Sequence, residues 1–149
     1  MDVKFNVIGL SETWFSDSTV DLYNIPGYNC SHVYRKNRRG GGVSVYIKET
    51  INFQPRRDLN VLDPILECVF VEINKLNVNC DKNIIVGAIY RPPGTDVQEF
   101  TDKFNILLDK IKRENKHCYL LGDYNINLLN ADSNIPTSNF CDSMFANHF

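Results

Sequence analysis

The hydrophobic pattern of this chain changes period between an apolar run that ends at Tyr90 and another that begins at His117. Between these runs, apolar side chains recur every three or four residues, as on one face of an amphipathic helix. The positions concerned are Val97, Phe100, Phe104, Leu107, Leu108 and Ile111. We expect Thr95 and Gln98 to form a capping box at the start of this helix. A helix placed between runs of strand length predicts layered α/β architecture.

The other predicted strands are short. Residues 5–10 (FNVIGL) are almost continuously apolar, which is typical of a strand buried on both faces. Residues 43–49 (VSVYIKE) are rich in β-branched and aromatic side chains. Residues 65–73 (ILECVFVEI) and 83–90 (NIIVGAIY) flank a turn and together predict a hairpin. The polar, turn-rich residues 16–32 predict a loop, and residues 139–149 a short helix.

Composition indicates one soluble globular domain spanning residues 1–149, with 43% hydrophobic and 23% charged residues. The net charge of −2 gives no overall basic field, so any nucleic-acid contact must come from local clusters. No apolar run approaches the ~18 residues of a membrane span, and the start lacks the pattern of a signal peptide. The five cysteines are scattered without a C-x-x-C pair, which favours reduced thiols in an intracellular protein.

Polar side chains directly follow the apolar strand of YLLGDYNIN, residues 119–127. Side chains two residues apart in an extended chain point the same way, so Asp123 and Asn125 would converge at the mouth of the sheet. Gly122 would leave backbone room beside them. The alternative is an Asx-type turn, in which both side chains bond local backbone amides.

Glu12 follows the first apolar run, in LSETW, as Asp123 follows a later one. Two carboxylates at strand ends suggest a site for a hard metal ion. The alternative is a solvated glutamate near a helix start, with Ser11 as the cap.

Two further segments carry cations. In YRPPG, Tyr90 ends a strand and Arg91 adds a planar fork of donors, a combination suited to phosphate oxygens. The alternative is a proline turn with an exposed arginine and a core tyrosine. The tract RKNRRGGG, residues 35–42, could hold a nucleic-acid backbone or form a solvated loop.

The histidines suggest no site. None of His32, His117 and His148 has a metal-ligand spacing or adjoins a candidate nucleophile, so all three are expected to fill surface or core positions. The sequence also lacks G-x-S-x-G, Walker-type and H-E-x-x-H motifs, which argues against the common hydrolase and nucleotide-binding classes.

In their order, the segments SETW, RRGGGV, ILECVFVEI, YRPP and GDYNIN resemble the endonuclease domain of non-LTR (LINE-type) retrotransposons. The resemblance covers nearly the whole chain and implies the endonuclease/exonuclease/phosphatase superfamily. It implies an α/β (α+β) fold, the DNase I-like four-layer αββα sandwich of two face-to-face sheets with helices outside. The implied reaction is hydrolysis of a DNA phosphodiester, which leaves a 3′-hydroxyl from which reverse transcription is primed.

The resemblance also implies roles for individual side chains. Glu12 corresponds to the principal Mg²⁺ ligand, and Tyr90 to a tyrosine whose hydroxyl approaches the scissile phosphate. Asp123 would orient or deprotonate the attacking water, and Asn125 would hold that water or a phosphate oxygen. Oxygen-only ligands independently favour Mg²⁺ or Mn²⁺ over zinc. The expected partners are DNA, acted on in the nucleus, and a reverse transcriptase domain of the full-length element, with DNA contacts from Arg38, Arg39 and Arg91.

The sequence departs from the family pattern at both ends. A first strand bearing an Asn and final strands bearing an Asp-His pair are missing, and His148 matches no catalytic position. We therefore expect an incomplete sandwich with little or no activity alone and with exposed, aggregation-prone sheet edges. An incomplete gene prediction or a decayed element copy would explain this. A phosphatase of the same superfamily and a catalytically dead nucleic-acid-binding remnant are the alternatives.

Overall fold

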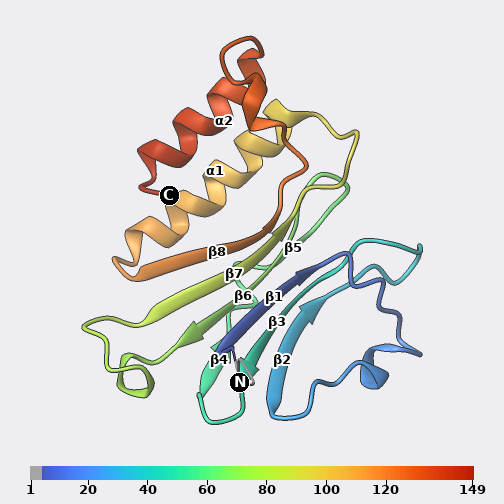
Figure 1. Ribbon diagram of the computed structural model, residues 1–149, viewed down its shortest axis with the longest axis vertical. Helices are drawn as coiled ribbons and strands as arrows, with labels where there is room; N and C mark the ends of the chain where they lie inside the picture. The colour runs from blue at the N-terminus through green and yellow to red at the C-terminus, as the bar shows by residue number, and fades with distance from the viewer. Residues whose placement is uncertain (1–4) are drawn as a thin grey trace.

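The computed structural model describes residues 5–149, which form two β-sheets with two α-helices on one side (Figure 1). The smaller sheet is antiparallel, in the order β1-β3-β2, and the larger has the order β4-β6-β7-β8, with β5 also paired to β6. The strands are β1 (Val7–Ser11), β2 (Tyr28–Val33), β3 (Val43–Lys48), β4 (Phe53–Pro55), β5 (Val61–Leu62), β6 (Glu67–Ile73), β7 (Ile84–Tyr90) and β8 (His117–Asp123). The helices are α1 (Val97–Arg113), α2 (Ile135–Ala146) and the 3₁₀ turns η1 (Val20–Leu22), η2 (Lys75–Asn77) and η3 (Leu128–Asn130).

The two sheets pack face to face through alternate residues of their strands. Val45 and Ile47 of β3 belong to the same buried cluster as Val71 of β6 and Val86 of β7. On the opposite face of the larger sheet, α1 packs its apolar stripe, and α2 adds Phe140. Figure 1 shows both helices side by side over that face. The apolar runs of β6 and β7 are thus buried on both faces, and the expected face-to-face sheets with outer helices are confirmed.

The pairing of β7 with β8 determines where the site lies. These strands are parallel, with Ile84 opposite His117 at one end and Tyr90 opposite Asp123 at the other. A parallel pair needs a crossover connection, which α1 supplies. The ends of both strands therefore meet at one edge of the sheet. β8 pairs only with β7 among the described residues, and Tyr119 and Leu121 on it are exposed.

Several local predictions were wrong. The N-cap of α1 is Asp96, whose carboxylate accepts from the Glu99 amide at 2.8 Å, because Thr95 instead contacts Arg91. β1 is not buried on both faces, since it lies at the edge of the smaller sheet and Leu10 is exposed.

Two further elements differ from the sequence-based expectation. Residues 28–33 form an unpredicted strand, β2, whose polar side chains suit its place at a sheet edge. The C-terminal helix starts earlier than predicted, at Ile135 behind the Asn134 cap. No helix within residues 5–149 has the length and apolar character that crossing a membrane requires.

Candidate active site

Glu12 and Tyr90 meet across the two sheets. Glu12 follows the last residue of β1, and Tyr90 is the last residue of β7. The Tyr90 hydroxyl donates a hydrogen bond to Glu12 Oε1, while Trp14 Nε1 donates to Oε2 at 3.0 Å. The tyrosine ring is buried between the sheets, and the carboxylate lies at the surface. This contact places Glu12 and Tyr90 together at the end of β7.

The backbone that presents Glu12 has an unusual conformation. Glu12 and Trp14 have φ of 53° and 56°, in the left-handed region that costs a non-glycine residue about 1–2 kcal/mol. Two hydrogen bonds hold the segment, from the Thr13 amide to the Gly42 carbonyl at 3.3 Å and from the Trp14 amide to the Gly41 carbonyl at 2.9 Å. The glycine tract thus positions the Glu12 loop.

A buried ion pair holds the glycine tract in turn. Glu67 is fully buried and accepts hydrogen bonds from Arg35 and, at 2.6 Å, from the Gly42 amide. Gly41 has a φ of +67°, and a Cβ there would lie 2.6 Å from the Arg35 guanidinium carbon. The sequence-based site did not include Arg35 or Glu67, although Glu67 lies in a segment of the family resemblance and Arg35 in the basic tract beside one. One indication of the role of Glu67 was present in the sequence, because it is a charged residue at the start of a mostly apolar strand.

The electrostatics keep Glu12 ionised and Tyr90 neutral. Hydrogen bonds from Tyr90 and then Trp14 lower the pKa of Glu12 below its usual range, and the positive charge of Arg35 adds to this. Burial and the bond to Glu12 raise the pKa of Tyr90 well above its ordinary value. At neutral pH the pair is a carboxylate acceptor beside a phenol donor.

Asp123 and Asn125 lie at the tip of β8, beside the tip of β7. Asp123 is exposed, and its Oδ1 accepts from the Asn125 amide at 3.0 Å, which is the Asx-type turn considered as the alternative. Asn125 lies beyond the end of β8, with a φ of 48°, so it is not in the extended conformation that the prediction assumed, although both residues line one pocket. The Asn125 side-chain amide donates to the Arg91 carbonyl at 2.8 Å.

The buried side chain of Arg91 links the end of β7 to the residues that follow β8. It is 4% exposed, and its guanidinium donates to the carbonyls of Tyr124, Asn125 and Thr95 at 2.7–2.8 Å. Its backbone amide donates to the Asp123 carbonyl at 3.0 Å. This geometry gives Arg91 a positioning role and leaves little of its fork for phosphate.

Arg38 and Arg39 lie on the surface beside Trp14. Both are exposed, and the Arg39 guanidinium carbon lies 5.0 Å from the centre of the Trp14 ring. A pocket of 470 Å³ opens between this basic loop and the Tyr90 strand end. Its lining includes Glu12, Trp14, Arg35, Arg38, Tyr90 and Thr95. Asp123 and Asn125 line a different pocket, of 630 Å³.

The donor set at this edge suits a hard divalent cation. Glu12 and Asp123 each offer an exposed carboxylate, Glu12 in the pocket of 470 Å³ and Asp123 in the pocket of 630 Å³, and the lowered pKa of Glu12 means that no proton competes there at neutral pH. In the part of the chain that the structure describes, no cysteine or histidine joins these two carboxylates. The one group there of three or more histidine, cysteine or acidic side chains lies at another place in the fold. The residues present therefore fit a cation of the Mg²⁺ or Mn²⁺ type.

Comparisons with known proteins identify the family of this chain. Residues 2–147 match the Endonuclease/Exonuclease/phosphatase family, whereas a search of curated proteins found no match. Similar solved structures include a protein of that family from Bacteroides thetaiotaomicron, 14% identical with a TM-score of 0.58, covering 93% of this chain and 53% of that one. Another is the human Nocturnin catalytic domain with bound sulfate, 15% identical with a TM-score of 0.53, covering 88% of this chain and 57% of that one.

The two structural likenesses show the fold, and the chain spans little more than half of either neighbour. The family match, by contrast, covers nearly all of this chain, from residue 2 to residue 147. This chain belongs to the endonuclease/exonuclease/phosphatase family, whose members are generally metal-dependent hydrolases.

Proposed function

We propose that this chain carries the site of a metal-dependent DNA endonuclease of the LINE retrotransposon type, which nicks target DNA to expose a 3′-hydroxyl for reverse transcription. The observation that carries the proposal is the Glu12–Tyr90 contact, made at the strand end where Tyr90 pairs with Asp123. The order of the motifs that present these residues supports the retrotransposon branch.

Each side chain has a distinct part in the proposed reaction. Glu12, with Asp123, would hold Mg²⁺, which when bound neutralises charge that develops on the phosphoryl oxygens. Tyr90 fixes the direction of the Glu12 carboxylate, and its single hydroxyl hydrogen would turn from Glu12 to a phosphate oxygen when DNA occupies the same pocket. The exposed Asp123 carboxylate would orient the attacking water and accept its proton.

The basic loop supplies a track for the DNA backbone. Arg38 and Arg39 lie on the loop whose glycines also hold Glu12, so a phosphate that they bind would be close to the candidate site. The net charge of −2 provides no competing basic field. Binding would therefore depend on this loop rather than on the protein as a whole.

A plasmid nicking assay tests the proposal. Wild-type protein should convert supercoiled plasmid to the open circle with Mg²⁺ and not with EDTA, at a low rate. Glu12→Gln and Asp123→Asn should each lower that rate by about 10²- to 10³-fold. Asp109→Asn, which changes an exposed carboxylate on α1, is the matched control and should not alter the rate.

The same assay separates the alternatives. Retention of DNA without any nicking would contradict the endonuclease and support a nucleic-acid-binding remnant. Hydrolysis only of small phosphate esters, lost in Glu12→Gln, would indicate a phosphatase of the same family. Nicking that survives both substitutions would show that the site has been wrongly placed.

A further inference from the structure

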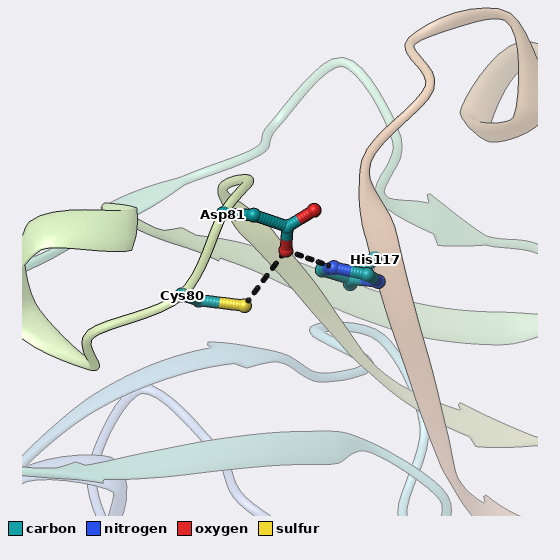
Figure 2. A group of neighbouring side chains, drawn as sticks. All are labelled: Cys80, Asp81 and His117. Atoms are coloured by element: carbon teal, nitrogen blue, oxygen red, sulfur yellow. Dashed lines mark hydrogen bonds and ion pairs between the residues drawn. The ribbon is translucent and has the colours of Figure 1, made fainter.

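A second group of ligand side chains lies at the opposite end of the larger sheet. Cys80 and Asp81 belong to the loop between η2 and β7, and His117 is the first residue of β8 (Figure 2). The pairing of β7 with β8 runs from His117 at this end to Asp123 at the candidate active site. The two groups are therefore separated by the full length of the strand pair.

The three side chains point toward one another (Figure 2). Asp81 Oδ1 lies 2.7 Å from His117 Nε2 and accepts from Cys80 Sγ at 3.5 Å. One ligand atom from each residue falls within 4.8 Å of the other two. Across residues 5–149, no other set of three histidine, cysteine or acidic side chains meets this condition.

Backbone hydrogen bonds hold the loop in place beneath these side chains. The Cys80 amide donates to the Lys75 carbonyl at 3.1 Å, and the Lys75 amide donates to Asn83 Oδ1 at 3.1 Å. The His117 amide donates to the Asn83 carbonyl at 3.3 Å, which connects the loop to β8. An ion that bound here would meet ligands whose backbone is already ordered, so little entropy remains to be lost.

We propose that Cys80, Asp81 and His117 form a binding site for a divalent cation of the zinc class. A thiolate, a carboxylate and an imidazole are ligands that Zn²⁺ prefers, whereas Mg²⁺ takes oxygen ligands. The thiolate and carboxylate charges offset the charge of the ion. Three protein ligands leave a fourth tetrahedral position for water.

Small side-chain movements would complete the coordination. Bonds of about 2.0–2.3 Å place the ligand atoms of a tetrahedral zinc site roughly 3.3–3.8 Å apart. The Cys80–Asp81 separation of 3.5 Å already falls in this range. The Asp81–His117 contact must lengthen by less than about 1 Å as the ion replaces the shared proton. The side chains of Asp81 and His117 are 71% and 43% exposed, so both can move that far.

Co²⁺ titration of the full chain in excess Mg²⁺ tests the site without measuring activity. We expect one Co²⁺ per chain, an intense near-ultraviolet thiolate-to-cobalt band, and visible bands of tetrahedral cobalt that Zn²⁺ bleaches. Cys80→Ser should abolish the charge-transfer band, and Asp81→Asn and His117→Gln should each weaken binding at least about tenfold.

Cys30→Ser provides the matched control. Cys30 Sγ lies 3.8 Å from His32 Nδ1, so it is another cysteine beside a histidine, but no third ligand joins that pair among the described residues. Its substitution should leave the cobalt spectrum unchanged, as should Glu12→Gln at the candidate nuclease site. A band that survives Cys80→Ser, or wild-type protein without a thiolate band at millimolar Co²⁺, would overturn the proposal.

Thermal unfolding gives a second readout. Zn²⁺ at 100 times its Kd should raise the Tm of the wild-type chain by about 5–10 °C and that of Cys80→Ser by much less. The ligand variants should fold, because their side chains lie at the surface, where an ion pair contributes little. An equal zinc-dependent shift in both proteins would contradict the site. The result is independent of whether the chain nicks DNA.

Discussion

The phenol of Tyr90, on the larger sheet, donates a hydrogen bond to the carboxylate of Glu12, which directly follows a strand of the smaller sheet. This contact joins the two layers at the edge where β7 and β8 end together. It also makes one residue part of both the core and the candidate site, since the Tyr90 ring packs between the sheets while its hydroxyl faces the pocket.

Tyr90→Phe should separate these two roles. The substitution keeps the ring and removes only the donor, so the free energy of unfolding should fall by about 1 kcal/mol while nicking falls by about tenfold or more. Chemical denaturation and the plasmid assay measure the two quantities. Tyr119→Phe, on an exposed tyrosine, is the control, and equal effects of the two substitutions would argue against a specific role for the Tyr90 hydroxyl.

The stability difference between wild type and Tyr90→Phe should depend on pH. The folded-state pKa of Glu12 lies below its ordinary value of 4.5. The stabilisation from the ionised carboxylate is therefore present above pH 4.5 and is lost as the pH falls through the folded-state pKa. The folded-state pKa of Tyr90 lies above its ordinary value of 10.0. The stabilisation from the neutral phenol is therefore present below pH 10.0 and is lost as the pH rises through the folded-state pKa. The difference should therefore be widest between these limits, and a profile flat from pH 3 to 11 would contradict the assignment.

Glu67→Gln should destabilise the fold and impair the site together. It would leave Arg35 without its buried partner, at a cost of about 3 kcal/mol, and loosen the Gly42 contact that holds the Glu12 loop. Denaturant unfolding should show the loss, and Glu49→Gln, on an exposed glutamate, should not. If the double variant Arg35→Met with Glu67→Gln regains stability but not nicking, the pair acts by positioning the loop.

Gly122→Ala should be more damaging than the same change at Gly27. Both glycines have positive φ, but a Cβ at Gly122 would overlap the Ile89 carbonyl of the neighbouring strand, whereas one at Gly27 meets nothing within 4 Å. We expect a loss of about 1 kcal/mol at Gly27 from the backbone alone and of more than about 3 kcal/mol at Gly122. Thermal unfolding of the two variants compares them directly, and equal losses would show that β8 moves aside easily.

Substitution of the basic loop should weaken DNA binding more than folding. Arg38→Ala and Arg39→Ala should each reduce the slope of log K against log[salt] by about one, because each would remove a phosphate contact. Arg39→Ala should also expose the Trp14 ring and change its fluorescence. Arg113→Ala, at the exposed end of α1, is the control in a fluorescence-anisotropy titration; a salt slope that also falls in this control would mean that binding is not confined to the loop.

Much of the framework could be predicted because its patterns are local. The stripe from Val97 to Ile111 identified α1, and the apolar runs identified the strands that are buried on both faces. β2 was missed because an edge strand can carry polar residues such as Asn29 and Ser31 without cost. The helix cap was placed one residue early because Thr95 is engaged by an arginine that only the folded chain brings close.

The candidate site was predicted less completely, since its supporting contacts are long-range. Nothing near Glu67 in the sequence shows that Arg35 and Gly42 will approach it. Arg91 was expected to contact a phosphate, but the pairing of β7 with β8 encloses it. His117 seemed to have no partner ligands because Cys80 and Asp81 are distant in the chain and become neighbours only when β7 and β8 align.

The contacts that build the candidate site join residues far apart in the chain, and this constrains when it can arise during synthesis. In a nascent chain, Glu12 would be made long before Tyr90 of β7. The hydrogen bonds from Arg91 to the residues after β8 would form only once those residues had left the ribosome. The candidate site could therefore assemble only after β8 and the residues that follow it have been made and the crossover through α1 has closed.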